Sequence, residues 1–186
     1  MVDGFPNGAE PGAEIQGEHR TQRPLVLGFG NVLLRDDGAG VFLASQLQEE
    51  QRQRVQAQPE SSFAYADFVD AGTMSFSLLP YIEARDALLI IDAADLGAVA
   101  GTVRLLEGAQ MDEFLISTRR RTVHEVGITD LLDMARLQGC LPARRALLCI
   151  QPGRIEWGEV LSPLVAEAIP AAALAASRLL AQWSVA

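Results

Sequence analysis

The stretch PLVLGFGNVLLRDDGAG, residues 24–40, predicts how this chain folds and where its chemistry lies. Its apolar start runs into two glycines, Gly28 and Gly30, which is typical of a buried strand that ends in a tight turn. A helix is expected after the turn, with one apolar face that carries Val41, Ala44 and Leu47. A strand, a glycine turn and a helix in this order indicate an alternating α/β fold.

The turn begins like a dinucleotide-binding loop but departs from that pattern. The fingerprint Gly-x-Gly-x-x-Gly requires a third glycine where this chain has Leu33. Asp36 and Asp37 would also repel a pyrophosphate from the start of the helix, where acidic side chains are themselves stabilised. One of the two carboxylates is therefore expected to cap the helix. Because neighbouring side chains on a helix diverge by about 100°, Asp37 then faces elsewhere, toward the open edge of the sheet, if Asp36 is the cap.

The alternation of strands and helices continues along the chain. Short apolar runs predict strands within FAYADFVDAGT (63–73), DALLIIDAAD (86–95) and RALLCIQP (145–152), and GTVRLLE (101–107) is a further candidate. Strands that are apolar throughout are typical of a parallel sheet with both faces covered. The fold class predicted is α/β, a three-layer α/β/α sandwich with a mostly parallel central sheet.

Three more helices are expected, two between these strands and one after the last of them. Thr73 is the predicted N-cap of a helix that buries Leu78, Leu79 and Ile82. In TVHEVGITDLLDMARLQGC (122–140), Thr122 and Glu125 fit a capping box, and Gly139 fits the end of the helix. Ser162 and Pro163 fit the start of a closing helix, which Pro170 is expected to kink or break.

Composition indicates one domain and excludes several kinds of partner. The 186 residues, 49% of them hydrophobic, suffice for one core, so we expect a single domain over 24–186 after a flexible polar arm over 1–23. A net charge of −9 argues against nucleic acid and membrane partners. We find neither a signal peptide nor an uninterrupted apolar run of roughly 18 residues, so a cytoplasmic location is expected. The protein is also expected to be a monomer when free, although no feature of the sequence decides this.

The two cysteines, Cys140 and Cys149, do not form a metal-binding or redox pair in the sequence. We therefore expect both to be reduced. Cys149 lies in an apolar run and is expected to be buried and inert, and we assign neither cysteine a catalytic role. Serine chemistry is also disfavoured, because no Gly-x-Ser-x-Gly elbow occurs.

Three side chains are candidates for a common site at one edge of the sheet. Asp37 follows the first strand, Asp70 ends the second, and His124 lies near the start of a helix. In alternating β/α folds, strand carboxyl ends and helix amino ends meet at the same edge. Asp70 has the alternative role of forming its turn, and His124 the alternative of packing on the core beside Ile128. Two carboxylates and a neutral imidazole suit a divalent transition metal such as nickel or zinc, although their spacing is not diagnostic.

These residues resemble a known family, the nickel-iron hydrogenase maturation endopeptidases. GFGNVLLRDDGAG is similar to the family's opening motif, DAGT stands at its second acidic position, and VHEVGITDLL resembles the segment with its metal-binding histidine. IIDAADLG, GTVRLLE and WGEVLSP follow in the family's order. The chain departs from the family in its polar N-terminal arm and in Ala71, where many relatives carry glycine.

The resemblance implies an α/β/α fold and an endopeptidase that removes the C-terminal extension of a hydrogenase large-subunit precursor after nickel insertion. It implies that Asp37, Asp70 and His124 are both the catalytic residues and the nickel ligands. The nickel would be carried mainly by the precursor, so the free protein need not hold a metal. Either Asp37 or Asp70 could act as the general base.

Two alternatives and one docking hypothesis stay open. A nickel-binding chaperone would use the same three ligands without cutting the precursor, and a nucleotide-binding oxidoreductase would use only the first turn. Arg119, Arg120 and Arg121 either form a solvated loop or attract an acidic part of the precursor.

Overall fold

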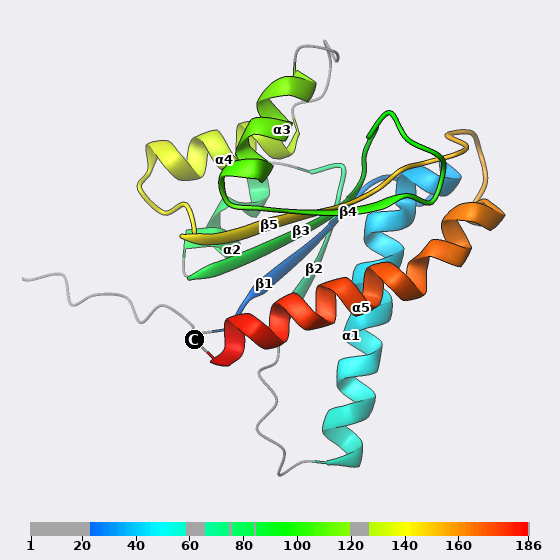
Figure 1. Cartoon of the computed structure of the whole chain (residues 1–186). Helices are drawn as coiled ribbons and strands as arrows, with labels where there is room; N and C mark the ends of the chain where they lie inside the picture. Colours follow the sequence, from blue (N-terminus) through cyan, green and yellow to red (C-terminus); the bar gives the residue numbers. More distant parts are fainter. Residues whose placement is uncertain (1–22, 59–65, 75, 84, 120–126, 186) are drawn as a thin grey trace, which may run out of the picture.

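The computed structural model describes residues 23–58, 66–74, 76–83, 85–119 and 127–185, which form one five-stranded sheet with helices on both faces (Figure 1). The strand order is β2-β1-β3-β5-β4, in which β4 is antiparallel to β5 and every other neighbouring pair is parallel. The strands are β1 (Leu25–Phe29), β2 (Asp67–Gly72), β3 (Ala87–Ala93), β4 (Val103–Glu107) and β5 (Arg144–Ile150). The predicted sandwich with a mostly parallel sheet is confirmed.

The helices form the two outer layers. They are α1 (Ala39–Ala57), α2 (Leu79–Glu83), α3 (Ala109–Arg119), α4 (Ile128–Leu137) and α5 (Pro163–Val185), and the short 3-10 turns η1 (Arg35–Gly38) and η2 (Phe76–Leu78) precede α1 and α2. Helices α1 and α5 cover one face, whereas α2, α3 and α4 cover the other.

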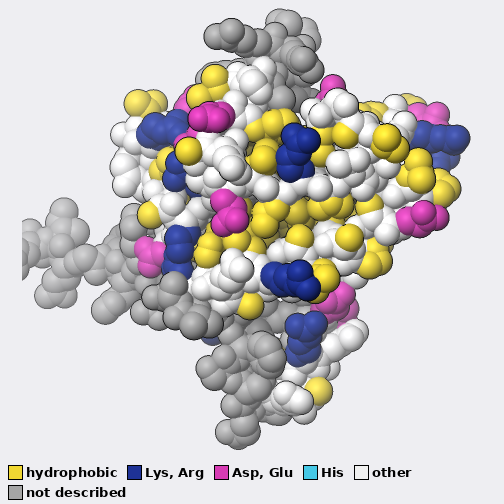
Figure 2. Space-filling view, viewed as in Figure 1, with side chains coloured by type: hydrophobic (Ala, Val, Ile, Leu, Met, Phe, Trp, Pro, Cys, Tyr) yellow, Lys and Arg dark blue, Asp and Glu magenta, His cyan; other side chains and the backbone are white. Residues whose placement is uncertain are grey.

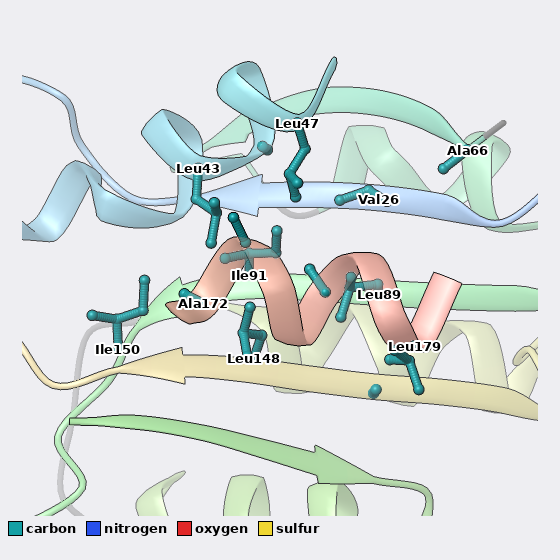
Figure 3. Packing of buried hydrophobic residues seen from close by; sticks show 14 of the residues in the cluster. Val26, Leu43, Leu47, Ala66, Leu89, Ile91, Leu148, Ile150, Ala172 and Leu179 are labelled. Atoms are coloured by element: carbon teal, nitrogen blue, oxygen red, sulfur yellow. The ribbon is translucent and has the colours of Figure 1, made fainter. Parts of the chain in front are cut away.

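Alternate side chains of the central strands supply the two cores. Along β3, Leu89 and Ile91 point to the face covered by α1 and α5, and Leu88 and Ile90 point to the opposite core. Figure 3 shows the first core, where Leu43 and Leu47 of α1 and Ala172 and Leu179 of α5 lie against the sheet. Both faces of the sheet are thus buried, which explains why its strands read as continuous apolar runs.

Helix α1 approaches the sheet closely because two glycines remove side chains from the contact. A Cβ added to Gly28 in β1 would lie 2.7 Å from the Gly40 carbonyl oxygen. A Cβ added to Gly40 would lie 2.4 Å from the Phe29 carbonyl oxygen and 2.3 Å from that of Ile91. The start of α1 is therefore held directly over the carboxyl ends of β1 and β3.

Several helix boundaries differ from those expected. Helix α4 begins at Ile128 with Gly127 at its N-cap, later than the start that the sequence suggested. The capping box predicted for Thr122 and Glu125 lies outside the described residues. The second helix begins with η2 at Phe76, so Thr73 is not its N-cap, although Leu78, Leu79 and Ile82 are buried as predicted. Helix α5 runs unbroken through Pro170. Helix α3 was not predicted, because its sequence carries no strong apolar period.

Helix α5 is the one helix among the described residues that is long and apolar enough to cross a membrane by length and composition, over Pro163–Ser184. Core helices of soluble proteins meet the same criterion. Its buried side chains belong to the core that it shares with α1 and the sheet, and they are Val165, Ile169, Ala172, Ala173, Ala176, Leu179 and Trp183. The helix therefore packs as part of the domain. The arm predicted over 1–23 lies outside the described residues apart from Arg23.

Strand β4 forms one edge of the sheet. This strand faces the viewer in Figure 1. Figure 2, drawn from the same side, shows apolar side chains across the middle of this face and charged side chains around them. Val103, Leu105 and Leu106 of β4 are partly buried. The opposite edge is formed by β2, and the candidate site lies at the carboxyl ends of β2 and β1.

Candidate active site

The turns after β1 and β2 are joined into one unit. Gly28 and Asp70 are paired in the parallel ladder, and beyond them the Gly30 N–H donates to the Gly72 carbonyl at 2.9 Å. Gly30 has a φ of +122°, and a Cβ there would lie 1.8 Å from the Asp37 carbonyl oxygen. The turn that carries Asp37 therefore requires glycine at this position.

Asp37 and Asp70 are each fixed by one carboxylate oxygen. The Asn31 N–H donates to Asp37 Oδ2 at 2.8 Å, and the Gly72 N–H donates to Asp70 Oδ1 at 2.9 Å. The Asp70 bond is the turn-forming role that the sequence left open. In the described part of the chain, the second oxygen of each carboxylate makes no hydrogen bond, and Asp70 is exposed. Both groups therefore keep one oxygen with which to bind a ligand.

The third predicted residue, His124, lies outside the described residues, as do Arg120 and Arg121. Among the residues that are described, no group of three histidine, cysteine or acidic side chains is placed to hold a metal ion. Asp37, on the turn after β1, and Asp70, near the end of β2, supply oxygen donors of a kind that transition-metal sites use. The assignment of the three ligands stays a prediction.

Asp36 has a different role from the one expected. Neither Asp36 nor Asp37 caps its own helix, because neither η1 nor α1 has a side-chain N-cap bond. The fully buried Asp36 carboxylate instead accepts N–H bonds from Gly153 (2.8 Å), Arg154 (2.8 Å) and Ser162 (2.6 Å). The Ser162 hydroxyl donates to it as well, at 2.7 Å. The capping prediction is therefore wrong for both residues, and Asp36 joins the Asp37 turn to the start of α5.

Sequence reasoning missed this contact because Asp36 and Ser162 are 126 residues apart. Burial tends to raise the pKa of the Asp36 carboxyl, but the bonds from Ser162, Arg154 and Gly153 outweigh it and lower the pKa below 3.8. The carboxylate is therefore ionised at neutral pH. A buried, ionised group with four donors rigidly fixes the elements that supply them.

The two cysteines are not part of the candidate active site. Both are reduced thiols, as the sequence predicted, and both are buried, which the sequence predicted for Cys149. Burial raises the pKa of the Cys149 thiol to about 12, with a smaller effect from Asp92 in the same direction and an opposing one from Arg104. A thiol with so high a pKa carries almost no thiolate at neutral pH and is a poor nucleophile.

Comparison with known proteins assigns the chain to a family. The model of the HycI hydrogenase maturation protease family matches residues 43–178. The chain belongs to the hydrogenase maturation protease family. Membership makes it a peptidase, as the resemblance of its motifs implied. The matched range includes Asp70 and His124 and begins after Asp37.

Individual relatives agree with this assignment. The hydrogenase expression/formation protein HupD of Rhodobacter capsulatus is 34% identical over 167 residues, which cover 89% of this chain and 75% of HupD. The hydrogenase 2 maturation protease of Escherichia coli is 32% identical over 144 residues, covering 77% of this chain and 81% of the relative. The structure of the hydrogenase maturating endopeptidase HybD from Escherichia coli superposes with a TM-score of 0.69 at 30% identity, covering 84% and 92% of the two chains.

Proposed function

We propose that the chain removes the C-terminal extension of a nickel-iron hydrogenase large-subunit precursor once nickel has been inserted. In this proposal Asp37, Asp70 and His124 bind the nickel that the precursor carries, and the same contact recognises the substrate and aligns the scissile peptide. The protein acts in the cytoplasm and is a monomer when free.

The observation that carries the proposal is the pair of carboxylates on the turn after β1 and near the end of β2. Each is oriented by a backbone N–H through one oxygen and keeps the other available. A ligand held in this way loses little side-chain freedom when it binds a metal ion. Nickel held there would polarise the peptide carbonyl or lower the pKa of a water molecule. Asp37 or Asp70 would supply the general base.

The test is to incubate the protein with purified large-subunit precursor, either loaded with nickel or free of it, and to follow the precursor mass. We expect loss of the extension from the loaded precursor only. Binding of the loaded precursor without a change in mass would indicate the alternative function, a nickel-binding chaperone. Cleavage of both precursors at the same rate would refute nickel-dependent recognition.

Side-chain variants test the three ligands in the same assay. We expect Asp37→Asn, Asp70→Asn and His124→Ala each to lower kcat/KM for the loaded precursor at least 100-fold, about 3 kcal/mol of transition-state stabilisation. Asp95→Asn is the matched control. Asp95 is exposed like Asp70, and its carboxylate likewise accepts a backbone N–H from two residues further along, that of Gly97 at 3.0 Å. Wild-type rates in all three ligand variants would refute their role.

A further inference from the structure

The irregular segment 153–160, between β5 and α5, is bonded to the turn that carries Asp37. In Figure 1 it is the orange stretch before α5, at the same edge of the sheet as the turn that leads into α1. The Arg35 N–H donates to the Gly158 carbonyl at 2.7 Å, and the Gly158 N–H donates to the Leu33 carbonyl at 2.9 Å. Together with the Asp36 bonds to Gly153 and Arg154, these contacts make turn and segment one framework.

Arg35 reinforces the framework with its side chain. Its guanidinium lies 3.2 Å from the Glu156 carboxylate and donates to the Val160 carbonyl at 3.4 Å. Arg35 also has a φ of +49°, a conformation that residues other than glycine rarely adopt. Backbone strain of this kind persists only where surrounding contacts hold it. The segment is therefore fixed in place although it contains no helix or strand.

This fixed framework exposes large apolar side chains to solvent. Trp157 is 78% exposed, and Ile155 and Val160 on the same segment are 59% and 71% exposed. Val32 and Leu33, on the turn itself, are about half exposed. We call these five residues the Trp157 surface. None of the five side chains belongs to either hydrophobic core. Exposed apolar side chains that gather on one surface are typical of a binding site.

The position of the surface identifies its partner. Val32 and Leu33 directly follow Asn31, whose N–H orients Asp37, so the Trp157 surface continues from the candidate active site. A peptidase has to hold the polypeptide beside the bond that it cuts, and substrate chain therefore passes over the surroundings of Asp37. Exposed tryptophan on a rigid backbone is a typical centre of such binding.

We propose that the Trp157 surface binds apolar side chains of the large-subunit precursor next to the peptide bond that is cut. This inference rests on the proposed function. It adds that the enzyme recognises apolar side chains of the precursor as well as the nickel that the precursor carries. The Trp157 surface then contacts the precursor equally well in the ground state and in the transition state. Loss of these contacts is therefore expected to raise KM and to leave kcat unchanged.

Cleavage kinetics with nickel-loaded precursor test the inference. We expect Trp157→Ser to raise KM about tenfold with little change in kcat, and Trp157→Phe to restore most of the affinity. Leu137→Ser is the matched control, because Leu137 is 87% exposed and ends α4, on the connection that leads to the amino end of β5, whereas the candidate site lies at strand carboxyl ends. An unchanged KM in Trp157→Ser, with a wild-type enzyme that cuts, would overturn the inference while leaving the proposed function intact.

Fluorine NMR gives a second readout that does not depend on cleavage. The chain has two tryptophans, exposed Trp157 and buried Trp183, so fluorotryptophan labelling gives two resonances that the Trp157→Phe variant assigns. We expect added precursor to shift the Trp157 resonance and to leave that of Trp183 unchanged. A shift that instead follows protein concentration, without precursor, would show that a second copy occupies the surface and would overturn the inference.

Discussion

At the scale of single residues, the adjacent Asp36 and Asp37 divide their roles. Asp36 is buried and has four hydrogen-bond donors, whereas Asp37 receives one and keeps an oxygen available. The first carboxylate is a structural anion and the second a candidate ligand. The sequence indicated that the two side chains diverge, but the donors to Asp36 lie more than a hundred residues away. Only the folded chain shows which of the two is buried.

Removing the charge of Asp36 is expected to destabilise the fold. Asp36→Asn keeps the shape of the side chain but turns an acceptor toward Gly153, Arg154 or Ser162 into a donor, which leaves buried N–H groups unpaired. We expect the free energy of unfolding to fall by about 2–3 kcal/mol, measured by urea denaturation. Asp95→Asn, at an exposed turn, is expected to leave it unchanged. Equal stability of the two variants would contradict the structural role of Asp36.

At the scale of elements, apolar pattern predicted every strand, while helix ends were less predictable. The buried runs of β1, β3 and β5 read directly as strands because both faces of the sheet are covered. Capping preferences pointed to Thr73 and Thr122, but the described helical residues begin at Phe76 and Ile128, and Thr122 lies outside the described part of the chain. Local capping is worth about 1 kcal/mol and is readily overridden by burial.

Helix α3, which the sequence did not predict, is joined to the sheet by an ion pair rather than by an apolar stripe alone. The Arg145 guanidinium of β5 donates to both oxygens of Asp112, and both side chains are mostly buried. These bonds lower the pKa of the Asp112 carboxyl against the opposing effect of burial, with Arg136 of α4 adding to the decrease. A pair between residues 33 apart has no signature in local sequence pattern.

The ion pair predicts a pH dependence of stability. The pKa of the Asp112 carboxyl is lower in the folded state than in the unfolded state. The ion pair therefore contributes fully to the free energy of unfolding above the ordinary pKa of 3.8, and this contribution is lost as the pH falls through the folded-state pKa. We expect Asp112→Asn to cost about 1–2 kcal/mol at neutral pH, and less as the pH is lowered. Thermal unfolding across this pH range measures the effect. Glu49→Gln, which removes an exposed pair with Arg52, should behave like the wild type.

At the scale of the whole molecule, we expect the two cores on either side of the one sheet to unfold together, because they share the strands that separate them. Cys149 lies in the middle of the sheet, fully buried in β5, and Cys140 follows α4 on the same side. The composition had indicated one domain of this size, and the two cores share the same five strands. The division into an arm over 1–23 and a domain over 24–186 stays a prediction.

Thiol labelling tests whether the domain opens only globally. The Cys149 thiol has a pKa of about 12 and no exposed surface, so a thiol reagent should reach it only after the sheet opens. We expect its labelling rate to follow global unfolding as denaturant is added, with Cys140→Ser used to isolate the signal. Labelling of the native protein at the rate of a free thiol would show that the core around β5 opens locally.

The distance along the chain between Asp36 and Ser162 has a consequence for biosynthesis. The ribosome makes the β1 turn early, but the donors that satisfy its buried anion emerge more than a hundred residues later. Until then Asp36 stays hydrated and the neighbouring Asp37 lacks its supporting framework. A nascent polypeptide that ends before this segment thus has Asp37 in its sequence without the contacts that support its turn, which form only once the residues that precede the last helix have been made.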